Sequence, residues 1–151
     1  MKFGVHIFIA GGLGKGMKRA CELKCETMQI FSRSPRSLRS PKPFLSREVD
    51  DFKRGLIENG ISPLVVHIPY LVNLASPKEE TYASSVNALR EDIERSITLG
   101  ARFLVLHPGS HMGDGEAAGI SRIARAIDTA LSGLPESLSG SLEPGRFQLL
   151  L

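Results

Sequence analysis

Short runs of apolar residues alternate along this chain with longer segments of helical period. Short apolar runs that are bounded by turn residues are typical of buried strands. The runs occupy residues 3–9, 27–31, 64–67, 103–106 and 147–151. The pattern therefore predicts five strands.

The longer segments predict four amphipathic helices, because their apolar residues recur every three or four positions. The first helix covers residues 13–23 and follows a tight turn at Gly11 and Gly12. The second and fourth carry apolar faces made of Val49, Phe52 and Leu56, and of Ile120, Ile123, Ile127 and Leu131. Each helix thus has one face to bury.

The third helix carries the clearest start and stop signals. Ser76 is placed to cap it, Pro77 takes its first position and Glu79 completes a capping box. Gly100 suits the left-handed residue that ends a helix. The apolar stripe between these signals consists of Tyr82, Val86, Leu89, Ile93 and Ile97.

Strands that alternate with helices imply parallel pairing through right-handed crossovers. Two architectures fit this alternation, a doubly wound sheet and a (β/α)₈ barrel. The glycines within residues 11–16 have the spacing of neither a dinucleotide fingerprint nor a P-loop, so we interpret them as a tight turn. A complete barrel usually needs about 250 residues. This chain has 151 and no interdomain linker, so residues 1–151 are predicted to be one domain or, in a barrel, the N-terminal part of a single domain.

Composition fits an ordinary globular domain. The net charge of +3 and the pI of about 9.1 favour approach to a polyanion without establishing one. Cys21 and Cys25 form neither a redox motif nor a disulfide framework, so we expect a reducing cytoplasm and cysteines that face the core or a neighbouring helix. The N-terminus lacks the features of a signal peptide, and no apolar run is long enough for a membrane span. Neither export nor membrane insertion is predicted.

Three histidines lie in comparable places along the predicted strands. His67 and His107 come at the ends of the third and fourth strands, and His6 lies inside the first. The carboxyl ends of barrel strands share one mouth, where the first two side chains would converge. Imidazole suits zinc, but a catalytic zinc typically takes three protein ligands. The spacing indicates either a shared metal that lacks a ligand or two hydrogen-bonded histidines, with His6 buried beneath the site.

Other polar and aromatic residues fall in the predicted loops at this mouth. Tyr70 either stacks on a base or packs in the core. The second loop carries Arg33, Arg36 and Arg39. These arginines either neutralise phosphates or form a solvated charged loop. His111 either orients a substrate or is solvated, and we favour the second.

Five segments give the chain a resemblance to the endonuclease IV family of apurinic/apyrimidinic endonucleases. They are GVH at residues 4–6, AGGL at 10–13, FSRSPR at 31–36, HIPYLVNL at 67–74 and LHPGSH at 106–111. The last two segments are the most specific. The similarity runs from Gly4 almost to the final residue.

The resemblance implies a TIM (β/α)₈ barrel, truncated here after about five strands and four helices. It also implies three zinc ions and hydrolysis of the phosphodiester 5′ to an abasic site in double-stranded DNA, leaving a 3′-hydroxyl. By resemblance, His67 and His107 match two zinc ligands, while Arg36 and Tyr70 match positions that enter the DNA. Substrate contact, or support of the zinc ligands, is expected of His6, Asn73, Ser110 and His111.

The chain departs from the family pattern at its C-terminus. There the family continues its fifth strand into a zinc-bridging glutamate within an ENTAGQG-like stretch, whereas residues 147–151 read FQLLL. Glu143 precedes the strand and is not accepted as a replacement. We therefore expect these residues alone to be an inactive, poorly folding monomer. A metal-dependent sugar isomerase or epimerase of the xylose isomerase-like barrels and a non-catalytic remnant of the fold are the alternatives.

Overall fold

The strands form one parallel sheet in the order of the chain. A computed structural model describes residues 1–142 and 145–151, so Glu143 lies outside the described residues. Over this range the sheet order is β1-β2-β3-β4-β5. The strands are β1 (Gly4–His6), β2 (Thr27–Phe31), β3 (Leu64–His67), β4 (Phe103–Val105) and β5 (Gln148–Leu150). Consecutive order without a reversal is the arrangement of a barrel rather than of a doubly wound sheet, which confirms the predicted truncated TIM barrel.

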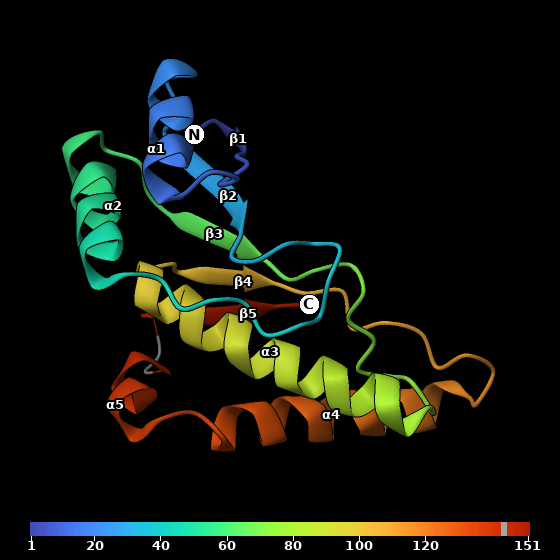
Figure 1. Ribbon diagram of the computed structural model, residues 1–151. Helices are drawn as coiled ribbons and strands as arrows, with labels where there is room; N and C mark the ends of the chain where they lie inside the picture. Colours follow the sequence, from blue (N-terminus) through green and yellow to red (C-terminus); the bar gives the residue numbers. More distant parts are fainter. Residues whose placement is uncertain (143–144) are drawn as a thin grey trace.

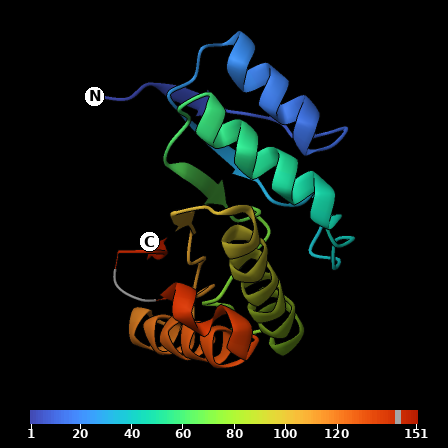
Figure 2. The same ribbon diagram turned by 90° about the vertical axis from the view of Figure 1, so that its left-hand side faces the viewer.

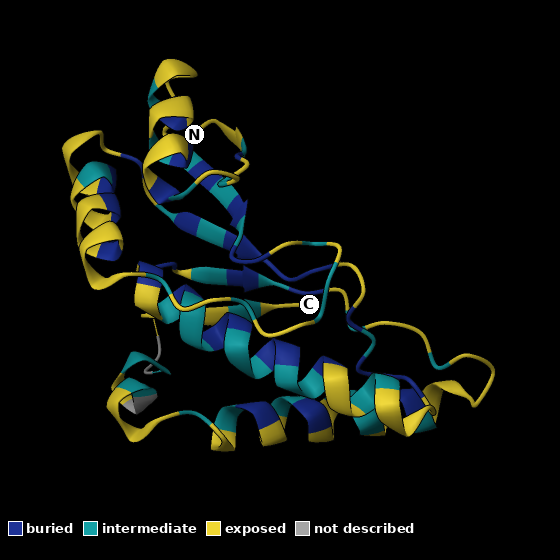
Figure 3. Ribbon diagram, in the orientation of Figure 1, coloured by how far each residue is buried: buried dark blue, intermediate teal, exposed yellow. Residues whose placement is uncertain are grey.

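The helices form a layer on the outer side of the strands (Figures 1 and 2). They are α1 (Leu13–Glu22), α2 (Ser46–Glu58), α3 (Glu79–Leu99), α4 (Glu116–Ser132) and the short α5 (Glu136–Ser139), which leads into the 3₁₀ turn η1 (Gly140–Leu142). Their buried stripes face the strands and their exposed faces point outward (Figure 3). None of the helices in the described ranges has the length and apolar character needed to cross a bilayer.

Residues on the outer face of the sheet make the core. Ile30, Val66 and Leu104 are neighbours in the strand register and have no exposed surface. They share one apolar cluster with Phe52 of α2 and Ile93 of α3. Cys25 belongs to this cluster and Cys21 packs against it, as predicted. Because side chains alternate along a strand, the opposite face carries Gln29, Phe31 and His67, and that face leads to the site.

Three local predictions were wrong. The first strand ends at His6 instead of continuing to residue 9, because its register with β2 stops at the pair His6 and Gln29. Ser76 does not cap the third helix: its Oγ accepts a hydrogen bond from the backbone N–H of Lys78 at 3.1 Å, in a turn that precedes α3. The short α5 was missed because four residues carry no helical period. Gly100 ends α3 in the left-handed conformation, as predicted, with φ 77°.

Candidate metal and nucleic-acid site

His67 is the last residue of β3 and lies almost fully buried at the carboxyl end of the sheet. Its Nδ1 is 2.6 Å from the backbone carbonyl oxygen of Ile68. A carbonyl oxygen only accepts, so Nδ1 must carry the proton and donate it. The Nε2 lone pair is then free, and a carbonyl-bound Nδ1–H is the usual support of a metal-binding imidazole.

Aromatic rings gather around His67. His107 follows β4 by two residues, and its ring centroid is 5.1 Å from that of His67. Tyr70 lies 5.1 Å from His67 and stacks on His107 at 6.1 Å with an interplanar angle of 22°. Phe31 at the end of β2 contacts both His67 and Tyr70 edge-on. The structure thus brings together His67, His107 and Tyr70, as the sequence predicted.

His6 lies next to this cluster, at the end of β1 and not inside the longer strand that the sequence predicted. As the last residue of β1, it is half-buried and its ring centroid is 4.5 Å from that of Phe31. The amide nitrogen of Gln29 donates to its Nδ1 at 2.9 Å, which leaves the His6 proton on Nε2. That Nε2 is buried without a hydrogen-bond partner among the described residues. Burial and the nearby His67 lower the pKa of His6, so the ring is neutral at neutral pH and offers one N–H donor.

The residues present fit part of a zinc site. The imidazoles of His67 and His107 lie side by side, after neighbouring strands. Because Nδ1 of His67 carries the proton, its Nε2 is the atom that could bind a metal. In the described part of the chain, histidine, cysteine, aspartate and glutamate form no group of three or more that could hold a metal ion. The described residues therefore offer two imidazoles that could bind a metal, whereas a catalytic zinc typically takes three protein ligands.

Asn73 links the two loops that follow β3 and β4. Its Oδ1 accepts hydrogen bonds from the backbone N–H groups of Ala75, at 3.1 Å, and Ser110, at 3.0 Å. The N–H of Leu74 also donates to the carbonyl of Pro108 at 3.0 Å. These bonds couple the loop after His67 to the loop after His107. Asn73 and Ser110 therefore support the positions of the two histidines.

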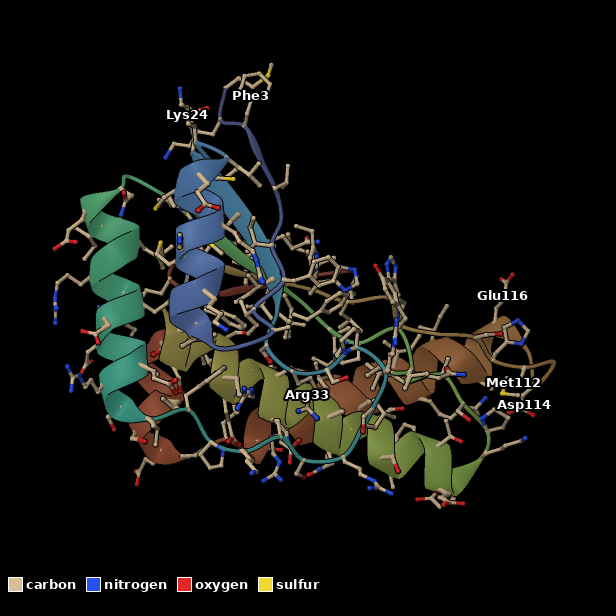
Figure 4. The ribbon with its side chains drawn as sticks, turned by 45° about the horizontal axis from the view of Figure 1, so that its top comes forward. Phe3, Lys24, Arg33, Met112, Asp114 and Glu116 are labelled. Carbon is tan, nitrogen blue, oxygen red and sulfur yellow. The ribbon has the colours of Figure 1, made fainter. Side chains whose placement is uncertain are left out.

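His111 organises the loop between β4 and α4. Its Nδ1 accepts hydrogen bonds from the N–H groups of Gly113, at 3.2 Å, and Gly115, at 3.1 Å. The ring is half-buried and bonded to its own loop, a structural role that the sequence interpretation did not consider. Figure 4 shows this loop, marked by Met112 and Asp114, at the end of the molecule opposite Lys24. With Nδ1 as acceptor, the proton of His111 sits on Nε2, an arrangement that holds the loop and does not favour metal binding.

Gly109 offers a test of the link through Asn73. A Cβ at position 109 would lie 2.1 Å from Asn73 Oδ1, and φ there is +101°. We expect Gly109→Ala to displace Asn73 and to lower the free energy of unfolding by about 1–3 kcal/mol beyond backbone strain. Gly113→Ala is the matched control, since φ is +94° and nothing lies within 4 Å of its Cβ. Urea unfolding of both variants measures the difference, and equal losses would contradict the link.

The arginines of the loop after β2 divide into two kinds. Arg36 and Arg39 are exposed, as a phosphate-binding role requires. Arg33 is buried and pairs with Glu91 and Asp92 of α3. Both alternatives predicted for it, a phosphate contact and a solvated side chain, were therefore wrong. Its partners lie 58 and 59 residues away along the chain, which hides the pairing from local patterns.

Gln29 is a site residue that the sequence interpretation missed. Its side chain lies on the inner face of β2 and fixes the tautomer of His6. The available signal was a polar residue in the middle of the apolar run TMQIF. A polar side chain in a buried strand needs a partner, and here the partner is set by the register of β1 on β2.

Comparisons with known proteins identify relatives of this chain. The sequence model of a family described as xylose isomerase-like TIM barrel matches residues 17–144. The probable endonuclease 4 of Carboxydothermus hydrogenoformans is 48% identical over 132 residues, which cover 87% of this chain and 46% of that protein. The chain therefore spans about half the length of the curated relatives it matches.

Solved structures show the same relationship in three dimensions. Endonuclease IV from Thermus thermophilus superposes with a TM-score of 0.78 at 29% identity, over 99% of this chain and 61% of that one. A D-psicose 3-epimerase superposes with a TM-score of 0.62 at 12% identity, over 99% of this chain and 51% of the other, a likeness of fold alone. By its sequence and its fold, the chain belongs to the endonuclease IV family of xylose isomerase-like TIM barrels.

Proposed function

We propose that this chain forms the N-terminal half of the working unit of a zinc-dependent DNA repair endonuclease. The unit hydrolyses the phosphodiester 5′ to an abasic site in double-stranded DNA and leaves a 3′-hydroxyl. It works as a cytoplasmic monomer with three zinc ions, of which this chain supplies ligands through His67 and His107. The chain by itself binds DNA and does not cut it.

The observation that carries the proposal is the ring pair His67 and His107 at the mouth of the sheet. Their centroids are 5.1 Å apart, and the bond from His67 Nδ1–H to the Ile68 carbonyl leaves Nε2 for a metal. Zinc, when bound, supplies an activated water and neutralises the charge that develops on a phosphate in an in-line displacement.

The residues around the pair favour DNA over a sugar. Tyr70 is 67% exposed and presents a ring that can enter a base stack. Arg36 and Arg39 add exposed positive charge on the neighbouring loop. Exposed aromatic and cationic side chains suit a large polyanion with stacked bases better than a small neutral sugar. Ketose turnover without any binding to abasic DNA would assign the chain to the rival class.

We expect the chain to bind abasic duplex more tightly than undamaged duplex, with an affinity that falls as salt rises. Arg36→Ala should weaken binding several-fold and lower the salt slope by about one, because one phosphate contact is lost. Lys24→Asn is the control: it removes the same charge at the opposite end of the molecule, and asparagine accepts its φ of 53°. Fluorescence anisotropy titrations measure both. Equal effects of the two variants would show that only net charge matters.

A further inference from the structure

The loop between β2 and α2 is held by a buried ionic network. Arg33, at the start of this loop, lies between the loop and α3 with 1% of its side chain exposed (Figure 4). Its Nη2 donates to Glu91 Oε2 at 2.7 Å, and its Nε pairs with Asp92 Oδ2 at 3.1 Å. The Asp92 side chain has no exposed surface. The first residues of the loop are therefore fixed on α3.

The same turn of α3 also holds the far end of the loop. Ser40 Oγ donates to Glu91 Oε1 at 2.5 Å. Arg95 donates from Nη2 to the carbonyl of Ser32 at 2.6 Å and from Nη1 to the carbonyl of Lys42 at 3.1 Å. Its guanidinium also lies 3.7 Å from the ring centroid of Phe44. Residues 34–39, which include Arg36, thus span two anchored ends.

Stability alone does not account for such a network. Burying charges has a large desolvation cost, and apolar residues of similar volume often give equal or greater stability. One atom, Arg33 Nη1, is buried without a hydrogen-bond partner in the described part of the chain. Burial raises the pKa of Asp92 despite the opposing effects of Arg33 and Ser32, so its ionised form is held at a cost. Glu91 behaves differently: burial opposes ionisation, but the hydrogen bonds from Ser40 and Arg33 leave its pKa lowered. The network thus stabilises one carboxylate at a cost to the other, and in both cases it fixes the path of the loop.

We propose that Glu91, Asp92 and Arg95 of α3 are positioning residues for DNA binding, since they fix the loop so that Arg36 meets the DNA backbone. This inference deepens the proposed function and rests on it for the identity of the ligand. Glu91 bonds to both ends of the loop, through Arg33 and Ser40, and is the residue to test first. It is only partly buried, so its replacement leaves the core of α3 intact.

The first experiment is limited trypsin digestion of the Glu91→Gln chain. Trypsin cleaves after exposed arginines, and Arg36 and Arg39 lie in residues 34–39, the segment between the two anchored ends of the loop. We expect the cleavage rate at these two sites, relative to the rate at other sites, to rise at least about fivefold, because residues 34–39 lose one of their attachments to α3. Glu94→Gln is the matched control, with the same charge change one turn away on α3. Uniform acceleration at all sites, or none, would overturn the anchoring.

The second experiment measures affinity for abasic duplex with the same two variants. Removal of a negative charge should by itself strengthen DNA binding. Lost positioning predicts the opposite sign, a several-fold weakening in Glu91→Gln that Glu94→Gln does not show. If Glu91→Gln instead binds as tightly as Glu94→Gln, the inference fails. If the unmodified chain binds no abasic DNA, the proposed function fails, and digestion alone decides whether α3 anchors the loop.

Discussion

Replacing His67 by alanine should abolish most incision of abasic DNA by a completed barrel. The test uses residues 1–151 joined to the C-terminal part of the Carboxydothermus relative, which is 48% identical over the shared region. We expect incision to fall by roughly a hundredfold to a thousandfold, because charge stabilisation by a metal is worth several kcal/mol. Cleavage of a labelled duplex that contains one abasic analogue measures the rate.

Zinc content separates this loss from misfolding. His67→Ala should lower the zinc content of the fused protein, because Nε2 of His67 is a ligand atom in the proposed site. His111→Ala should retain zinc, since the Nδ1 of His111 accepts two loop N–H groups and its Nε2 carries the proton. Normal zinc content and normal incision in His67→Ala would refute the proposed ligand. Incision that resists chelators would refute the zinc mechanism as a whole.

The second large effect concerns the core. Phe52→Ala should lower the free energy of unfolding by about 3–5 kcal/mol, because the side chain is buried between α2 and the sheet and its removal leaves a cavity. A loss of this size is a large fraction of the roughly 5–15 kcal/mol typical of a domain.

Ile57 on the same helix is the matched control. Its side chain is 82% exposed, so Ile57→Ala should change the unfolding free energy by no more than about 0.5 kcal/mol. Urea unfolding followed by circular dichroism compares the two variants. Similar losses at both positions would show that α2 is not packed on the sheet as described.

The sequence predicted the parts of the fold that depend on local pattern. The run LVVH and the stripe from Tyr82 to Ile97 each carry the period of their element, and both occur where expected. The end of β1 was misplaced, because its pairing with β2 ends at Gln29 although β2 itself continues to Phe31, and the local pattern of residues 7–9 does not reveal this. Ser76 was misassigned because a serine hydroxyl can satisfy a turn as well as a helix end.

The sequence could predict only the part of the site that follows from the convergence of strand ends. His67 and His107 were identified because one ends β3 and the other follows β4 closely, and the carboxyl ends of neighbouring parallel strands lie side by side. The tautomer of His6, fixed by Gln29, and the burial of Arg33 arise from contacts between distant segments. No single window of sequence contains both partners of such a contact. From charge alone, Arg33 and Arg36 were treated alike. In the structure Arg33 is buried in an ion pair and Arg36 is exposed.

The bonds through Asn73 also matter for engineering. Its amide oxygen accepts a hydrogen bond from the Ser110 N–H of the neighbouring loop, and a Cβ at Gly109 would collide with it. We therefore expect residues 68–76 and 108–115 to tolerate exchange only as one unit. A graft of one loop alone would bring a mismatched partner. Swapping both loops together should preserve the fit, so a chimera with a relative should exchange the two loops as a pair.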